Sequence, residues 1–303
     1  MQRRLERLLV ALSCIAVTGS SISAVAASND KSGRTELHIR TTSRVVLRVV
    51  RLGRRSTKPP LILVSGWTVG LEVWDSVATE LASDREVVLL DSRSQGGSTT
   101  TTADNRPEDR ARDLAVVLRR LNISRPILIG WSQGAQDVAA YVRAFGDTNL
   151  AGCVLVDAAP SGGPKDLTHD PGEALKFFEL LALYRSSPLD YQRGMMSFII
   201  GDPARAELRE RLARRGLKTP TTIGADMLVA DLYGADRSNV RFSRPLLVLI
   251  AGRNPDPAPL KAWAESNHAN VKVVANASHA LFVDQPEQFV RAIKDFEAQV
   301  DEQ

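Results

Sequence analysis

The chain has 303 residues, of which 44% are hydrophobic and 24% are charged, a composition typical of a globular protein with a substantial core. The formal net charge is only +4. Because nucleic-acid binding requires a concentrated basic face, this balance argues against a nucleic-acid partner.

The N-terminus has the three parts of a secretory signal peptide. Three arginines within the first seven residues precede the apolar run LLVALSCIAV, and the small residues of AVAAS follow it. The apolar run is too short to span a bilayer as a mature helix. We predict a signal peptide over residues 1–27, with cleavage after Ala26 or Ala27, export to the periplasm or the medium, and no stable membrane association after cleavage. An uncleaved N-terminal anchor is the alternative.

Short apolar runs alternate with segments of helical period from residue 35 onward. TELHIR and RVVLRVVRL are expected to form an antiparallel pair of strands. The further expected strands cover residues 60–67, 86–91, 126–131, 152–157, 244–252 and 270–276. The expected helices cover residues 73–83, 107–122, 133–146, 257–267 and 285–300. This pattern predicts the α/β class, with a mainly parallel, doubly wound sheet covered by helices on both faces.

Residues 161–240 interrupt the alternation. EALKFFELLALY, YQRGMMSFII and AELRERLARR are helical in period, and no convincing strand lies between them. We therefore predict one domain over residues 28–303, with a helical cap inserted at about 161–240.

A candidate nucleophile lies in GWSQG, where Ser132 separates an expected strand from an expected helix. A serine on such a sharp turn has a strained backbone and an exposed hydroxyl, and Gly130 and Gly134 allow strand and helix to pass closely. The helix N-terminus and the backbone N–H of Gln133 would stabilise developing negative charge. We predict that Ser132 is a nucleophile and Gln133 an oxyanion donor. A structural or phosphate-binding turn is the alternative.

A serine nucleophile needs a base, and the chain has four histidines: His38, His169, His268 and His279. His279, in NASHALFVDQPEQF, follows the last expected strand and precedes the final helix. Its loop emerges at the carboxyl edge of the sheet, where Ser132 also lies and where ligands of open α/β sheets bind. We predict that His279 is the general base and acid.

Together these motifs resemble the α/β-hydrolase fold superfamily over roughly residues 36–300. LVSGW is similar to the family's oxyanion loop, DSRSQGGS to its Asp-x-Arg turn, GWSQG to its nucleophile elbow and SHALFVDQPEQF to its histidine loop. The resemblance implies an esterase-like serine hydrolase with a helical cap. It also implies that the Trp67 backbone N–H completes the oxyanion hole with Gln133, and that Asp91 and Arg93 are structural. The rings of Trp67 and Trp131 either shape an acyl pocket or pack.

The resemblance leaves two candidates for the triad acid. The family usually places this acid in a Gly-x-x-Asp pattern after the strand PLLVLIAG. Here AGRNPDP has Pro255 at that position and Asp256 one residue later. We expect Asp256 to orient His279. Asp157, in LVDAAP, is the alternative, because haloalkane dehalogenases take their acid from the end of the preceding strand.

The expected function is that of an exported serine hydrolase that cleaves a small-molecule acyl ester through an acyl-enzyme. A thioesterase, lactonase or amidase on the same triad, or a catalytically inactive binding protein of this fold, are the alternatives. No cofactor or metal is expected, since the histidines lie far apart in the sequence and no cysteine cluster is present. The expected partner is a small-molecule acyl substrate, and no oligomeric state is indicated.

Overall fold

A computed structural model describes residues 25–29, 33–161, 171–233 and 237–301, and these form one sheet whose strand order is β1-β2-β3-β5-β4-β6-β7-β8-β9. The strands are β1 (Val25–Asn29), β2 (Thr35–Arg40), β3 (Val46–Leu52), β4 (Leu61–Val64), β5 (Val87–Leu90), β6 (Ile127–Trp131), β7 (Gly152–Val156), β8 (Leu246–Ala251) and β9 (Asn270–Val274).

The sheet is antiparallel at one end and parallel over the rest. β1, β2, β3 and β5 pair antiparallel in that order, and every pairing from β5 through β4 to β9 is parallel. The mainly parallel sheet with an antiparallel pair at its start is thus confirmed. The predicted signal peptide lies mostly outside the described residues, and its last three residues, Val25–Ala27, belong to β1.

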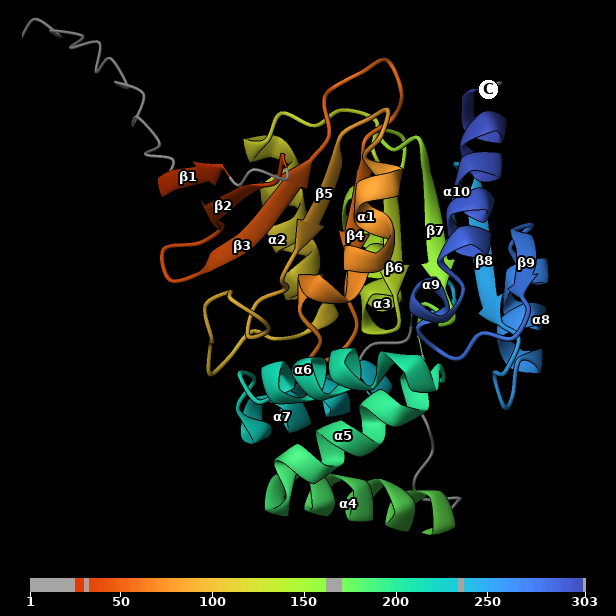
Figure 1. Ribbon diagram of the computed structural model, residues 1–303. Helices are drawn as coiled ribbons and strands as arrows, with labels where there is room; N and C mark the ends of the chain where they lie inside the picture. The colour runs from red at the N-terminus through yellow and green to blue at the C-terminus, as the bar shows by residue number, and fades with distance from the viewer. Residues whose placement is uncertain (1–24, 30–32, 162–170, 234–236, 302–303) are drawn as a thin grey trace, which may run out of the picture.

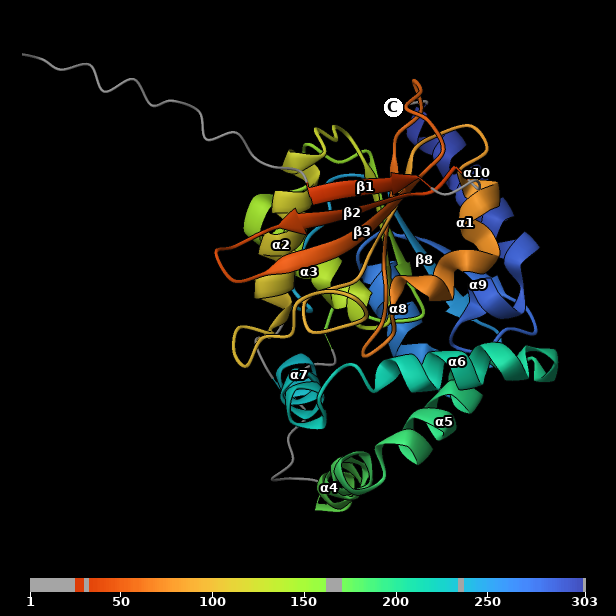
Figure 2. The same ribbon diagram turned by 60° about the vertical axis from the view of Figure 1, so that its left-hand side comes forward.

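Helices cover both faces of the sheet, which explains why the central strands are apolar at every position. All residues of β4 are buried: Leu61 and Leu63 pack into one core, and Ile62 and Val64 into the other. The first core contains η1 (Leu71–Trp74), α1 (Asp75–Leu81), α9 (Leu281–Asp284) and α10 (Pro286–Asp301), and the second contains α2 (Pro107–Arg120), α3 (Gln133–Phe145) and α8 (Ala258–Ser266). Figures 1 and 2 show these two layers on opposite sides of the sheet.

Within the described residues, four α-helices lie between β7 and β8, in the segment predicted to form the cap. They are α4 (Pro171–Ser186), α5 (Pro188–Ile199), α6 (Ala206–Gly216) and α7 (Thr221–Tyr233), with η2 (Pro203–Arg205) between α5 and α6. In Figure 1 they lie across the end of the sheet to which the parallel strands point, with α4 farthest from the sheet. Residues 162–170 and 234–236 of the predicted cap lie outside the described residues.

No helix in the described part of the chain is both long and apolar enough to cross a membrane.

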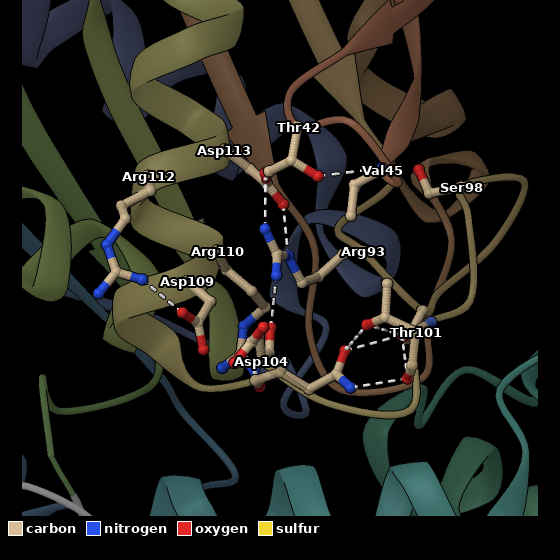
Figure 3. A network of polar contacts seen from close by, with 12 residues as sticks. Thr42, Val45, Arg93, Ser98, Thr101, Asp104, Asp109, Arg110, Arg112 and Asp113 are labelled. Atoms are coloured by element: carbon tan, nitrogen blue, oxygen red, sulfur yellow. Dashed lines mark hydrogen bonds and ion pairs between the residues drawn. The ribbon is translucent and has the colours of Figure 1, made fainter.

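The turn after β5 has the structural role expected for Asp91 and Arg93. The buried Asp91 carboxylate accepts the backbone N–H groups of Leu71 (2.7 Å) and Gly97 (2.8 Å). Arg93 forms a bidentate pair with Asp113 of α2, at 2.6 and 2.8 Å (Figure 3). A bidentate pair between planar groups fixes orientation as well as distance, so the turn is held against α2 beside the carboxyl edge of the sheet.

Candidate active site

Ser132 lies in the sharp turn that GWSQG predicts. β6 ends at Trp131, α3 begins at Gln133, and Ser132 between them has φ 56° and ψ −120°, a conformation that non-glycine residues seldom adopt. A Cβ added at Gly130 would lie 2.3 Å from the Gly134 carbonyl oxygen. Strand and helix therefore pass too closely for a side chain at this position, which is the geometry of a nucleophile elbow.

The structure pairs His279 with Asp157. The distance between His279 Nδ1 and Asp157 Oδ2 is 2.8 Å. The Asp157 side chain is 3% exposed, and its Oδ1 accepts the Ala251 N–H and the Asn254 side-chain amide, each at 2.9 Å. A carboxylate at this position accepts a hydrogen bond from an Nδ1–H group, so the contact favours the imidazole tautomer that leaves Nε2 as the acceptor. This is the tautomer that a general base requires.

The expectation that Asp256 would contact His279 is wrong, and the alternative, Asp157, takes that place. Asp256 is exposed, and its backbone N–H donates to Asn254 Oδ1 at 2.9 Å. The last residue of β8, Ala251, and the loop residue Asn254 thus donate hydrogen bonds to Asp157, and this segment supplies no acid to His279. Asp157 directly follows β7, the neighbour of β6, and so lies one strand away from Ser132.

The backbone around His279 is fixed on both sides. Trp131 Nε1 donates to the His279 carbonyl oxygen at 2.9 Å, and the two rings lie 5.5 Å apart between centroids. The N–H of Ser278 donates to Asp284 Oδ2 at 2.8 Å, and that of Ala280 to the Ile199 carbonyl at 2.7 Å. Because Trp131 directly precedes Ser132, one residue anchors both the elbow and the histidine loop. The sequence predicts that the Trp131 ring packs or lines a pocket, and it does not predict this hydrogen bond.

The loop after β4 touches the elbow, as the resemblance to the oxyanion loop implies. A Cβ added at Gly66 would lie 3.0 Å from the Ser132 Cβ, which places Gly66, the neighbour of Trp67 in the chain, against the nucleophile candidate. Within the described residues, the backbone N–H groups of Trp67 and Gln133 have no backbone partner. Free N–H groups next to a serine can bind an oxyanion, and the roles of Trp67 and Gln133 as its donors stay predictions.

The indole of Trp67 faces the cap. Its centroid lies 5.0 Å from the ring of Tyr184 and 6.0 Å from that of Tyr191. Burial raises the pKa of both phenols, that of Tyr191 to about 12, so both rings are neutral at ordinary pH. The cap therefore presents an uncharged aromatic surface to the oxyanion loop.

A pocket of about 460 Å³ borders the His279–Asp157 pair. Arg253 and Asn254 line it from the loop after β8, and Phe198 of α5 lines it from the cap. Small-molecule sites typically have volumes of about 300–1,000 Å³, so this cap–sheet boundary has room for a small ligand.

Comparison with known proteins defines the class. Residues 61–292 match the alpha/beta hydrolase family, and the chain belongs to that family. It is an α/β-fold hydrolase.

Individual relatives share only 25–28% sequence identity with this chain. The chain is 26% identical to a 2-hydroxy-6-oxononadienedioate/2-hydroxy-6-oxononatrienedioate hydrolase of Paraburkholderia xenovorans, over 93% of this chain and 97% of that protein. It is 28% identical to a pimeloyl-[acyl-carrier protein] methyl ester esterase of Nitrosomonas europaea, over 77% and 93%. Its 25% identity to the biotin biosynthesis bifunctional protein BioHC of Cellvibrio japonicus covers 79% of this chain but 48%, about half, of that protein.

A solved structure with a similar fold is the thermophilic esterase of Thermogutta terrifontis. The TM-score is 0.74 at 22% identity, over 88% of this chain and 98% of that one.

Proposed function

We propose that this hydrolase is an exported serine esterase that cleaves small-molecule acyl esters with Ser132, His279 and Asp157. The observation that carries the proposal is the 2.8 Å contact between His279 Nδ1 and the buried Asp157 carboxylate, beside a serine on a strained strand–helix turn. A relative named as a methyl ester esterase, which matches 77% of the chain, supports ester substrates.

The geometry supports the following reaction. His279 Nε2 takes the Ser132 proton while Ser132 Oγ attacks the ester carbonyl, and Asp157 stabilises the resulting imidazolium. The backbone N–H groups of Trp67 and Gln133 bind the oxyanion of the tetrahedral intermediate. His279 then protonates the departing alcohol, which leaves an acyl-enzyme. A water molecule, deprotonated by His279, releases the acid and restores the Ser132 hydroxyl.

Covalent labelling tests the nucleophile. We expect purified protein treated with a fluorophosphonate to gain the mass of one adduct, because the activated Ser132 hydroxyl displaces fluoride from phosphorus. Ser132→Ala should gain none, and His279→Ala should react roughly 10²–10⁴-fold more slowly, since it lacks the general base. The measurement is intact-mass spectrometry over time, with circular dichroism to show that each variant is folded. A folded parent that takes up no label would favour the alternative of an inactive binding protein.

Export is tested separately, on the full-length chain expressed in a bacterial host. We expect the protein in the periplasm or medium, with a mature N-terminus at Ala27 or Ser28, because residues 1–27 have the layout of a signal peptide. Fractionation and N-terminal mass analysis measure this. An uncleaved chain in the membrane fraction would support the anchor alternative, and an uncleaved chain in the cytoplasm would contradict export.

A further inference from the structure

Both residues assigned to the oxyanion hole are hydrogen-bonded, through their side chains, to the same cap helix. Trp67 Nε1 donates to the Gly224 carbonyl of α7 at 2.9 Å, and Gln133 Nε2 donates to Asp231 Oδ2 of α7. Gly224 and Asp231 are seven residues, or about two helical turns, apart, so they lie on one face of α7. Met227 lies between them on this face and is fully buried in the cluster that contains Trp67.

The Gln133 side chain is held at both ends. Its Oε1 accepts the Gln95 side-chain amide at 2.8 Å, while its Nε2 is bound by Asp231. Gln95, Gln133 and Asp231 are all buried. A buried amide with a donor at one end and an acceptor at the other has one favourable orientation. Since Gln133 directly follows Ser132, fixing its side chain also restricts the peptide between them, whose N–H is the proposed oxyanion donor.

Asp231 is itself anchored to the sheet domain by an ion pair. Arg110 Nη2 of α2 donates to Asp231 Oδ1 at 2.8 Å, and Arg110 Nε donates to Asp137 Oδ1 of α3 at 2.7 Å. All three side chains are buried. Removing one partner of a buried ion pair costs several kcal/mol of stability, about 3–5 in general, so α7 has one strongly preferred position against α2 and α3.

The Trp67 side is held by packing as well as by its hydrogen bond. Tyr184 of α4 and Tyr191 of α5 lie against the indole at centroid distances of 5.0 and 6.0 Å. A large ring enclosed in this way has little rotational freedom. The oxyanion loop is therefore attached to the cap through Trp67, and the elbow is attached to the cap through Gln133.

We propose that α7 assembles the oxyanion hole, with Asp231 and the Gly224 carbonyl as its positioning groups. The inference rests on the proposed function. Neither group touches the substrate: each sets the orientation of a residue whose backbone N–H does. A misplacement of about 1 Å in a catalytic group can reduce a rate by about 100-fold. The position of α7 against the sheet domain therefore controls the rate of the chemical step.

Two variants separate this role from packing, because each keeps the backbone N–H of the oxyanion residues. Trp67→Phe removes the indole donor and keeps an aromatic ring between Tyr184 and Tyr191. Asp231→Asn keeps an acceptor for Arg110, which also keeps its hydrogen bond to Asp137, but the new amide nitrogen cannot accept from Gln133.

The matched control is Thr219→Val. Thr219 Oγ1 donates to the Ser94 carbonyl at 2.8 Å, a buried hydrogen bond between cap and sheet domain that involves neither Trp67 nor Gln133. Valine has nearly the same shape as threonine and lacks the hydroxyl. This variant therefore reports what the loss of one cap contact does on its own.

The experiment measures kcat and KM for a p-nitrophenyl ester, and Ki for an aryl trifluoromethyl ketone. Ser132 Oγ adds to the ketone carbonyl, its proton passes to His279, and the hemiketal oxyanion occupies the oxyanion hole, so Ki reports on the hole directly. In Trp67→Phe and Asp231→Asn we expect kcat to fall by about 10- to 100-fold, Ki to rise by a similar factor and KM to change by less than about threefold. In Thr219→Val, kcat and Ki should stay within about threefold of the parent.

The possible failures are distinguishable. An active parent whose Trp67→Phe and Asp231→Asn variants match Thr219→Val in kcat and Ki would overturn the inference and leave the proposed function intact. A rise in KM with unchanged kcat and Ki would also overturn it, because it would mean that α7 only shapes the substrate site. A folded parent without ester turnover or labelling would overturn the proposed function, and the inference with it. Trp67→Phe alone decides the matter if Asp231→Asn does not fold.

Discussion

Replacing Asp157 by asparagine is expected to lower kcat/KM for ester hydrolysis by about 10⁴-fold. Asparagine suits the backbone here, because Asp157 has φ 50° and asparagine tolerates this left-handed region well. Its carbonyl oxygen can still accept from Ala251 and Asn254, so its amide nitrogen faces His279 Nδ1. Two donors cannot form a hydrogen bond with each other, so the imidazole is expected to adopt the tautomer that carries its proton on Nε2. His279 then cannot accept the Ser132 proton.

The matched control is Asp256→Asn, which makes the same chemical change on an exposed loop. Its stability is expected to stay within about 0.5 kcal/mol of the parent, and its kcat/KM should be unchanged, because the His279 ring is paired with Asp157 and not with Asp256. Steady-state kinetics on a p-nitrophenyl ester, with thermal melts to compare folding, measure both variants. Equal losses in the two variants, or a larger loss in Asp256→Asn, would show that Asp157 is not the triad acid.

Replacing Gly130 by alanine is expected to destabilise the protein by about 3 kcal/mol and to abolish fluorophosphonate labelling. The added Cβ would lie 2.3 Å from the Gly134 carbonyl oxygen and 2.7 Å from the Ala135 nitrogen. Both are backbone atoms, so rotation of a side chain cannot relieve the contact. β6 and α3 must separate, and this moves Ser132, which lies between them. Urea denaturation gives the stability, and intact-mass kinetics give the labelling rate.

Gly194→Ala is the control for the glycine-to-alanine change itself. Gly194 lies within α5, and a Cβ added there would meet no heavy atom within 4 Å. Alanine is favoured over glycine in a helix interior by about 1 kcal/mol, so this variant should be more stable than the parent and should label at the parent's rate. If Gly130→Ala were as stable and as reactive as Gly194→Ala, the close passage of strand and helix would not be needed for the elbow.

Much of the fold and part of the site follow from local sequence. LILV at residues 61–64 predicts a buried strand because each of its side chains is apolar, whichever face it occupies. GWSQG predicts a strained turn because its glycines and serine are separated by single residues, so neighbouring atoms define the geometry. The assignment of His279 needed one further step, that the carboxyl ends of parallel strands share an edge.

The acid depended on contacts that the sequence alone does not specify. Asp157 and Asp256 both follow buried strands, and the family pattern favours the loop that contains Asp256. Asp157 contacts His279 because β7 lies beside β6 in the sheet. Its carboxylate is stabilised by the Ala251 N–H at the end of β8 and by the side-chain amide of Asn254, which follows β8. Stabilising a buried charge requires donors from several segments, and only the folded chain brings those segments together.

The hydrogen bonds that join Trp67 and Gln133 to the cap likewise depend on the tertiary structure. Trp67 and Gly224 are 157 residues apart in the sequence, and Gln133 and Asp231 are 98 apart. The sequence by itself determined the elements, the strand–helix turn at Ser132 and the loop at His279, because these depend on periodicity and on neighbouring residues. The tertiary structure decided which carboxylate contacts His279 and which groups contact the side chains of Trp67 and Gln133, because buried polar groups are stable only where distant segments satisfy their hydrogen bonds.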